Sequence, residues 1–242
     1  MDFSPGPLHQ QSEHLLQEFS VQTPHDYPVD TGNLAGYIDH TRLKVETTIA
    51  DIERFCDDAR RHTFAAVCFN PIYVAAAKRF LEGSNVQIAT VVGFPLGAEN
   101  TLTKAVDTRC AVSDGATEID MVIAVGLLKS QEYEQVHHDI AEVVRAASGR
   151  PVKAIIESSD LTDREKVVAC LIARDAGASY VKTSSGFGRG GATTNDVALM
   201  KYVVGPDMNV KASTGIKTRD DAIKMIRAGA LRLGTSAGPT FS

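Results

Sequence analysis

The sequence lacks any apolar run close to the roughly 18 residues that a membrane-spanning helix requires, so we expect no transmembrane segment. Its first 33 residues contain no arginine, and they lack both the basic start and the apolar stretch of a signal peptide. We therefore expect neither a secretory signal nor a transit peptide. Basic residues are not in excess, since 25 Lys and Arg are opposed by 30 Asp and Glu, a net charge of −5. This balance opposes binding to nucleic acid or to an anionic membrane surface, although it allows a local basic pocket for a small anion.

Cysteine is also sparse, and the four cysteines show no pattern of a metal or disulfide site. They lie far apart, with no C-x-x-C pair and no histidine at zinc spacing: Cys56, Cys68, Cys110 and Cys170. We expect reduced thiols, most of them buried, in a cytoplasmic protein without a bound metal. A chain of 242 residues buries roughly 70% or more of its unfolded surface, so it needs no disulfide or metal for stability.

From Gly36 onward, short apolar segments rich in β-branched residues alternate with longer segments of helical period. Eight strands are predicted, at residues 37–39, 64–69, 88–92, 118–123, 152–157, 180–184, 209–212 and 231–234. Seven helices are predicted between them, at residues 48–61, 72–81, 100–113, 131–147, 163–176, 194–202 and 219–228. Threonines precede four of these helices and glycines follow two, as expected of helix caps: Thr47, Thr162, Thr193, Thr218, Gly177 and Gly229.

Eight strand–helix units in one chain are the number of a (β/α)8, or TIM, barrel, which typically takes about 250 residues. We therefore predict one α/β barrel domain over residues 34–242, with a doubly wound open sheet as the alternative. Residues 1–33 are predicted to be an N-terminal extension that is partly helical. Four apolar residues would form one face of a short helix, and two prolines would mark a linker: Leu8, Leu15, Leu16, Phe19, Pro24 and Pro28.

Charged residues within the predicted strands favour the barrel over the open sheet: Asp39, Asp120, Lys153, Lys182 and Lys211. A parallel strand is covered on both faces, so a charge within it must be paired or functional. In a barrel, such residues near the carboxyl ends of the strands converge on the active-site mouth.

Lys182 and Lys211 lie on consecutive predicted strands, each before a loop of Ser, Thr and Gly. In a barrel these strands are neighbours, so the two side chains would share one poorly solvated site. Desolvation and like-charge repulsion both lower the pKa of a lysine, and a neutral lysine can form an imine with a carbonyl substrate. The alternative is a structural lysine that pairs with Asp or Glu at the end of its strand. We favour the imine-forming site because the two lysines occur together.

Asp120 would lie across the same mouth, where a carboxylate between two lysines can move protons during imine formation and carbon–carbon bond making. Its alternative role is a plain ion pair with Lys153 or Lys211. Asp39 is a weaker candidate, since it could simply end the first strand. Cys68 lies in an apolar strand with no neighbouring base, so we expect it to line the pocket rather than to act as a nucleophile.

Small residues follow the last three predicted strands, at Ser185-Gly186, at Thr214-Gly215 and at residues 234–236. They predict a phosphate site, because barrels often bind phosphate with the loops after strands 7 and 8. A G-x-G-x-x-G match at residues 186–191 suggests a dinucleotide instead. That match lies in the sixth unit rather than the first, and Lys211 stands near the position where an acidic residue is required.

At these residues the sequence resembles the deoxyribose-phosphate aldolase family, over residues 38–238. The matching segments keep the order and spacing of that family: 38–41, 67–71, 91–97, 118–123, 181–187, 210–216 and 232–236. The resemblance implies a (β/α)8 barrel that works without a metal or other cofactor. It also implies the reversible joining of acetaldehyde to D-glyceraldehyde 3-phosphate, which forms 2-deoxy-D-ribose 5-phosphate.

The resemblance assigns roles to single residues. Lys182 matches the imine-forming lysine, Lys211 the second lysine that lowers its pKa, and Asp120 the proton-relay aspartate. Other residues match the substrate pocket or the phosphate-binding loops: Asp39, Cys68, Gly186, Gly215, Gly234 and Ser236. We expect five more residues to contact the substrate: Thr41, Lys153, Thr183, Ser185 and Thr214.

Three residues depart from the family pattern. Thr214 replaces the first of two glycines usual after the second lysine, where its side chain would either crowd the phosphate or add a hydroxyl donor. Phe187 stands where some members place a phosphate-contacting lysine, which would lower the affinity for phosphate. Ala237 replaces a serine found in many members. None of these changes removes the imine-forming residues.

The expected ligands are therefore a small phosphorylated sugar and acetaldehyde, and the expected assembly is a homodimer or a higher homo-oligomer. Three other functions stay open: an imine-forming aldolase for a different phosphorylated sugar, a phosphosugar-binding protein without turnover, and a nucleotide-binding oxidoreductase.

Overall fold

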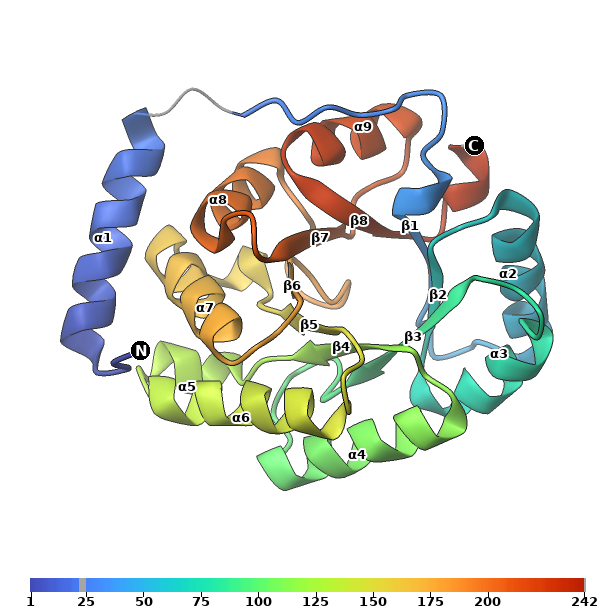
Figure 1. Cartoon of the computed structure of the whole chain (residues 1–242), viewed down its shortest axis with the longest axis horizontal. Helices are drawn as coiled ribbons and strands as arrows, with labels where there is room; N and C mark the ends of the chain where they lie inside the picture. Colours follow the sequence, from blue (N-terminus) through green and yellow to red (C-terminus); the bar gives the residue numbers. More distant parts are fainter. Residues whose placement is uncertain (22–24, 242) are drawn as a thin grey trace.

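Eight parallel strands form a closed barrel in the computed structural model, which describes residues 1–21 and 25–241 (Figure 1). The strands are β1 (Ile38–Arg42), β2 (Ala66–Phe69), β3 (Gln87–Val92), β4 (Glu118–Val122), β5 (Val152–Ile155), β6 (Tyr180–Lys182), β7 (Asn209–Ser213) and β8 (Ala230–Thr235). Each strand pairs with the next along the chain, and β8 pairs with β1 to close the sheet. The predicted TIM barrel is confirmed, and the open-sheet alternative is wrong.

Helices surround the barrel and cover the outer face of the strands (Figure 1). They are α2 (Ile49–His62), α3 (Val74–Phe80), α4 (Thr101–Asp114), α5 (Val125–Lys129), α6 (Tyr133–Ala146), α7 (Asp163–Asp175), α8 (Thr194–Val204) and α9 (Arg219–Arg227). All seven predicted helices are present. Helix α5 was not predicted, because its five residues are too few to show a helical period. None of the helices within the described ranges is long and apolar enough to cross a membrane.

Capping threonines explain where several helices begin. The side chains of four threonines accept a backbone N–H from the first turn of the helix that follows: Thr48, Thr162, Thr193 and Thr218. The predicted cap Thr47 is therefore wrong by one residue, since its hydroxyl instead donates to the carbonyl of Lys44 at 2.6 Å. Gly177 and Gly229 follow α7 and α9 at φ of 84° and 112°, a conformation in which glycine ends a helix without strain.

The N-terminal extension forms a longer helix than expected, α1 (Pro5–Val21), which lies against α7 and α8 on the outside of the barrel (Figure 1). Leu8 is fully buried in this contact, and Leu15, Leu16 and Phe19 pack at its edge. The predicted linker residue Pro24 lies outside the described residues. The chain is described again from residue 25, where the backbone N–H of Tyr27 donates to Arg227 on α9.

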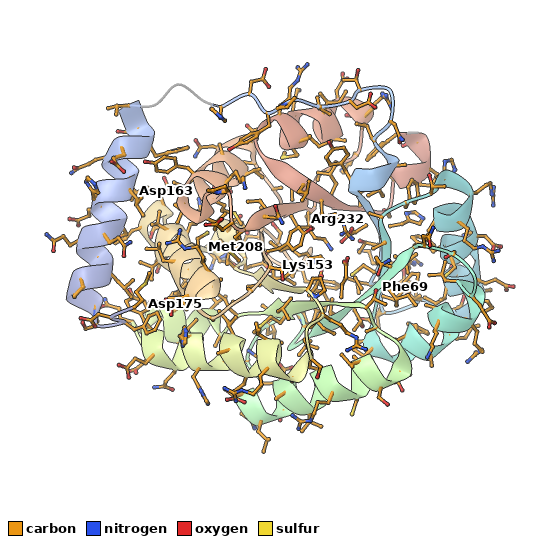
Figure 2. The ribbon with its side chains drawn as sticks, in the orientation of Figure 1. Phe69, Lys153, Asp163, Asp175, Met208 and Arg232 are labelled. Carbon is orange, nitrogen blue, oxygen red and sulfur yellow. The ribbon has the colours of Figure 1, made fainter. Side chains whose placement is uncertain are left out.

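The interior of the barrel is divided into an apolar part and a charged part. On the side of β2 and β3, Cys68, Ala89 and Val91 pack against Leu43 in a small apolar cluster of their own. The remaining strands direct charged side chains inward, and Figure 2 shows two of them, Lys153 of β5 and Arg232 of β8, within the ring of strands. The charged part lies at the predicted site.

Candidate active site

The two lysines singled out by the sequence lie side by side on adjacent strands. Lys182 of β6 and Lys211 of β7 occupy paired positions in the parallel sheet. Both Nζ atoms contact the same oxygen of Asp120, at 2.8 Å from Lys182 and 2.6 Å from Lys211. All three side chains are buried. The barrel therefore brings the three predicted catalytic residues together, as expected of charges on its inward face.

Asp120 also makes the ion pairs that were its alternative role. Its second oxygen, Oδ1, accepts from Lys153 Nζ at 2.8 Å, across the β4–β5 pairing. Three lysines thus share one carboxylate. Burial alone would raise the pKa of Asp120, but the charges of Lys153, Lys182 and Lys211 hold it well below its usual value. Asp120 is therefore ionised at neutral pH.

Two further charged residues, which the sequence analysis missed, extend this group deeper into the barrel. Glu118 lies two positions before Asp120 on β4, and its Oε2 contacts Lys153 Nζ at 2.5 Å. Arg232 of β8 donates from its two terminal nitrogens to Glu118, at 3.1 and 3.0 Å, and from Nε to Asp39 at 2.5 Å. Asp39 in turn contacts Lys211 Nζ at 2.5 Å. A two-residue period along each strand was the signal available, because residues i and i+2 face the same side.

The pKa values of the two lysines shift in opposite directions, although burial and like-charge repulsion act on both. For Lys182, burial and the nearby charge of Lys211 lower the pKa, and the single carboxylate of Asp120 does not offset them. For Lys211, burial also opposes the charge, but Asp120 and Asp39 outweigh it and raise the pKa. Lys182 is therefore the lysine suited to attack a carbonyl, while Lys211 stays a cation beside it.

A cavity of about 350 Å³ opens above this group, at the carboxyl ends of the strands. Lys182 lies at its base and lines it, whereas Lys211 and Lys153 do not. Seven of the predicted substrate-binding residues also line it: Thr41, Ser185, Gly186, Thr214, Gly215, Gly234 and Ser236. Four others do not reach it: Asp39, Cys68, Lys153 and Thr183. The cavity thus joins the reactive lysine to the loops predicted to bind phosphate.

The four residues that do not line the cavity have other contacts. Thr183 ties β6 to β7, since its hydroxyl accepts the backbone N–H of Ser213 at 3.0 Å. Cys68 belongs to the apolar cluster, and burial raises the pKa of its thiol, which keeps it protonated. Asp39 and Lys153 are held within the ion pairs described above.

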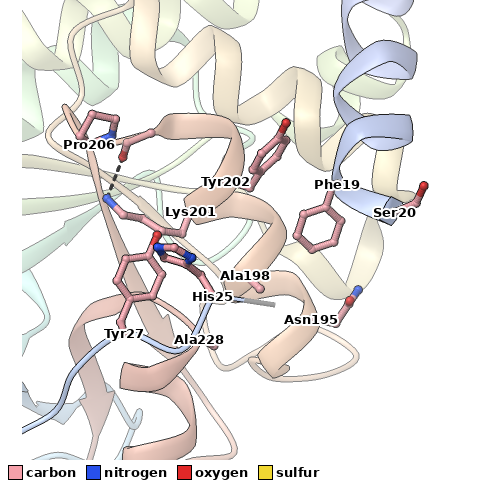
Figure 3. Close-up of a pocket in the computed structure, with 11 residues that line it drawn as sticks. Phe19, Ser20, His25, Tyr27, Asn195, Ala198, Lys201, Tyr202, Pro206 and Ala228 are labelled. Carbon is pink, nitrogen blue, oxygen red and sulfur yellow. Dashed lines mark hydrogen bonds between the residues drawn. The ribbon is translucent and has the colours of Figure 1, made fainter. Parts of the chain in front are cut away.

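A larger cavity, of about 640 Å³, lies outside the barrel between the end of α1, α8 and the segment around Tyr27 (Figure 3). It contains Lys201, whose pKa is lowered by burial. The Nζ of Lys201, however, donates to the carbonyls of Gly205 and Met208 at 2.7 and 2.9 Å. None of the predicted site residues lines this cavity, and no carboxylate lines it either among the described residues. Lys201 therefore lacks the proton-transfer partner that Asp120 gives Lys182.

A family model described as DeoC/LacD family aldolase matches residues 26–239. The chain belongs to this aldolase family. It is 54% identical over 206 residues to the deoxyribose-phosphate aldolase of Macrococcus caseolyticus, a match that covers 85% of this chain and 94% of that one. The deoxyribose-phosphate aldolase of Thermotoga maritima is 55% identical over 201 residues, which cover 83% of this chain and 81% of that one.

Among solved structures, the tetrameric deoxyribose phosphate aldolase from Aeropyrum pernix superimposes with a TM-score of 0.82 at 29% sequence identity. That match covers 98% of this chain and 96% of the other. The glycine-rich match at residues 186–191 fits the aldolase rather than a dinucleotide fold. Its first glycine lines the cavity, and α8 begins only at Thr194, whereas a dinucleotide fingerprint opens the helix itself.

The departures from the family pattern have structural consequences at the rim of the cavity. Thr214 has a φ of 73°, in the left-handed region, which explains why glycine is usual at this position. Phe187 is half exposed, and its ring lies edge-on to Phe94 and 5.9 Å from the Nζ of Lys44. Lys44, from the loop after β1, thus lies beside the position of Phe187, where some family members have a phosphate-contacting lysine.

Three cations line the cavity that the sequence analysis did not single out: Arg42, Lys44 and Lys217. Arg42 is already paired, with Glu46 at 3.4 Å and Asp51 at 4.0 Å. Lys44 and Lys217, in contrast, make no ion pair with any carboxylate among residues 1–21 and 25–241. They are therefore free to bind an anion that enters the cavity.

In the same ranges no group of three or more His, Cys, Asp or Glu residues is arranged to hold a metal ion, and the absence of a metal cofactor stays a prediction.

Proposed function

We propose that this protein is a class I aldolase that reversibly cleaves 2-deoxy-D-ribose 5-phosphate to acetaldehyde and D-glyceraldehyde 3-phosphate through an imine on Lys182. The observation that carries the proposal is the position of Lys182 at the base of the cavity, in contact with Asp120 at 2.8 Å. Its lowered pKa supplies the neutral amine. The substrate follows from the chain's relatives, which are named deoxyribose-phosphate aldolases.

In the direction of synthesis, the Nζ of Lys182 attacks the carbonyl carbon of acetaldehyde, and the carbon–nitrogen bond forms as the oxygen leaves as water. The protonated imine then loses a methyl proton and becomes an enamine. The enamine carbon attacks the aldehyde carbon of D-glyceraldehyde 3-phosphate, whose oxygen gains a proton. Water finally hydrolyses the new imine, which releases the sugar phosphate and returns Lys182 to its amine form.

Asp120, with Lys211 and a water molecule, moves the protons in these steps. Asp120 contacts both lysines through one oxygen, so a proton given up at Lys182 has an acceptor 2.8 Å away. The lysines around Asp120 hold its pKa well below the usual value, so it is a weak base that does not keep the protons it accepts.

The cavity rim supports a phosphorylated acceptor. Lys44 and Lys217 supply unpaired cations, and the loops at Gly186, Gly215 and Gly234 supply backbone N–H groups without covering side chains. Glu157 fixes one of these loops, since its carboxylate accepts the backbone N–H of Ser185 at 3.1 Å. Phosphate binding in barrels commonly uses such loops with one or two cations.

Trapping of the imine tests the proposal. Borohydride reduction in the presence of acetaldehyde should leave a reduced adduct on Lys182, located by peptide mass spectrometry. The matched control is Lys201→Ala, which removes the partly buried lysine of the outer cavity and should leave the adduct unchanged. An adduct on another lysine, or an undiminished adduct in Lys182→Ala, would contradict the assignment.

Turnover distinguishes the remaining alternatives. A phosphosugar-binding protein without turnover would bind deoxyribose 5-phosphate and would release no acetaldehyde from it. An aldolase for a different phosphorylated sugar would prefer another acceptor when several aldehydes compete. We expect deoxyribose 5-phosphate to be cleaved, and D-glyceraldehyde 3-phosphate to win the competition.

The proposal includes a homodimer or a higher homo-oligomer, supported by the tetrameric aldolase from Aeropyrum pernix. It also includes the division of the chain into an extension, residues 1–33, and a barrel domain, residues 34–242. This division is supported by the position of α1 outside the ring of helices and by the start of β1 at Ile38. The cytoplasmic location stays a prediction.

A further inference from the structure

The buried charged residues of the barrel form one continuous set of ion pairs, with an unequal number of cations and carboxylates. We call this set the charge cluster. Its members are Asp39, Glu118, Asp120, Lys153, Lys182, Lys211 and Arg232, all of them buried. Four cations face three carboxylates, so the formal charge is +1 when every member is ionised. It becomes zero when one cation gives up its proton.

A net charge buried away from water is costly, whereas a balanced set of ion pairs is tolerated. Lys182 is the cation with the fewest partners. Lys153 contacts three carboxylates, Glu118 at 2.5 Å, Asp120 at 2.8 Å and Asp39 at 3.8 Å. Lys211 contacts two, at 2.5 and 2.6 Å, but Lys182 contacts Asp120 alone. The cluster is therefore balanced at least cost when Lys182 is neutral.

Arg232 makes this imbalance permanent. A guanidinium stays protonated in proteins, so it cannot be the group that gives up a proton. It binds Glu118 with two nitrogens and Asp39 with a third, and it does not line the cavity. Both carboxylates that Arg232 binds also form an ion pair with a lysine: Asp39 with Lys211, and Glu118 with Lys153.

We propose that Arg232 is a positioning residue that engages Asp39 and Glu118 from deep in the barrel, so that Lys153 and Lys211 must share Asp120 and Lys182 is left as the unbalanced cation. The connection runs along two routes. One passes from Arg232 through Asp39 and Lys211 to Asp120, and the other through Glu118 and Lys153 to Asp120. Arg232 thus acts on the nucleophile without touching the substrate.

Other groups around Lys182 do not restore the balance. Cys68 of β2 keeps its proton because burial raises the pKa of its thiol. The carboxylate of Glu157, after β5, accepts the backbone N–H of Ser185 and makes no ion pair with the cluster among the described residues. The nearest cations at the rim, Arg42, Lys44 and Lys217, would only add positive charge. The lowered pKa of Lys182 agrees with the charge count.

The inference rests on the proposed function, in which Lys182 is the nucleophile, and the pH dependence of imine trapping tests it. The rate of borohydride-trapped imine formation should rise with pH as Lys182 loses its proton. In Arg232→Gln, Asp39 and Glu118 lose their guanidinium partner and pair with the lysines alone. We expect the rise of the trapping rate to move to higher pH by about one unit or more. In Glu118→Gln, one carboxylate is lost and the rise should move to lower pH.

The double variant Arg232→Gln/Glu118→Gln restores the excess of one cation, and its pH profile should return close to that of the parent protein. A purely structural role for Arg232 would instead lower the rate at every pH, and the two losses would accumulate in the double variant. Arg232→Lys, which keeps the charge, should keep the pH profile even if its rate falls.

An unshifted profile in Arg232→Gln would overturn the inference, as would shifts of the same sign in both single variants. If Arg232→Gln does not fold, Glu118→Gln decides alone, because an unshifted or alkaline-shifted profile there also overturns it. A failure of the proposed function looks different, since the parent protein would then form no adduct on Lys182 at any pH.

Discussion

The charge cluster inside the barrel and the cations at the rim of the cavity hold similar side chains in opposite ways. Within the cluster, Lys153 and Lys211 each contact two carboxylates at 2.5 to 2.8 Å, and both are fully buried. At the rim, Lys44 and Lys217 are exposed and have no carboxylate partner among the described residues. The same residue type is immobilised in one region and available to a ligand in the other.

The paired lysines of the charge cluster and the unpaired lysines of the rim are suited to different parts of the substrate, the carbonyl and the phosphate. Chemistry at the carbonyl needs an amine whose charge is set before the substrate arrives, and buried ion pairs set it because they are screened little by water. Binding of a phosphate needs a charge that becomes paired only when the substrate is present. Changes in the cluster should therefore alter proton chemistry with any substrate, and changes at the rim should alter only the use of the phosphate group.

The largest effect that would sharpen this comparison is expected from Lys211→Met. Loss of this ammonium leaves Asp39 and Asp120 with one cation fewer, so Lys182 keeps its proton to higher pH. We expect kcat/KM to fall about 100- to 10,000-fold at neutral pH, the range typical of general acid–base residues. The loss should be equal for deoxyribose 5-phosphate and for deoxyribose, and steady-state kinetics on both sugars measures it. Lys201→Met, the control from the outer cavity, should retain full activity.

A smaller and selective effect is expected from removing the cations of the rim. In Lys44→Ala and in Lys217→Ala, kcat/KM for deoxyribose 5-phosphate should fall about 3- to 10-fold, since charge-assisted contacts at exposed sites contribute about 1 kcal/mol. The values for deoxyribose should not change. Lys78→Ala, which removes an exposed lysine of α3 outside the cavity, is the matched control. Equal losses on both sugars would show that the two regions do not divide the tasks.

How far sequence predicts this site depends on what orients each side chain. Strand residues are orientated by the period of two, so charges at Asp120, Lys182 and Lys211 could be placed in one mouth once a barrel was predicted. The same period applies to Glu118 and Arg232, which were not predicted. Glu118 is the first residue of β4, where a charge can lie outside the barrel interior, whereas Arg232 is the third residue of β8 and was overlooked. Their importance comes from their partners across the barrel, and only the folded chain shows those partners.

Loop residues are harder to predict, because no period orients them. Lys44 and Lys217 follow β1 and β7 in loops, and their direction towards the cavity depends on the local backbone. The protonation of Lys211 was also beyond the sequence. Burial and repulsion were foreseen correctly, but the second carboxylate, Asp39, contacts Lys211 at 2.5 Å and reverses the direction of its pKa shift.

Salt should separate the two regions further, with an effect of about two- to three-fold. Added salt screens exposed charges over a Debye length of about 10 Å at 0.1 M and about 3 Å at 1 M, but it hardly screens buried pairs. We expect the KM for deoxyribose 5-phosphate to rise between 0.05 and about 0.5 M sodium chloride. The rate of imine trapping with acetaldehyde should stay constant. A trapping rate that falls with salt would mean that Lys182 is more accessible to ions than its burial implies.

A similarly small effect is expected at Thr214, which combines a strained backbone with a side chain at the rim. Its φ of 73° costs about 1 kcal/mol or more for a residue with a Cβ, but glycine loses about as much again through its freedom in the unfolded chain. Thr214→Gly should therefore shift the melting temperature by less than about 4 °C, as measured by calorimetry.

The kinetics of two Thr214 variants then decide whether the hydroxyl helps or crowds the phosphate. The hydroxyl makes no hydrogen bond among the described residues, and its oxygen would lie 3.2 Å from a Cβ built on Gly186, so it faces the loop of the cavity. We expect it to donate to phosphate. Thr214→Ser should then keep the KM for deoxyribose 5-phosphate, and Thr214→Gly should raise it about three-fold, the loss of roughly one weak hydrogen bond. A lower KM in Thr214→Gly would show instead that the side chain crowds the ligand. The affinity of the rim for phosphate would then be limited by space rather than by the number of hydrogen-bond donors.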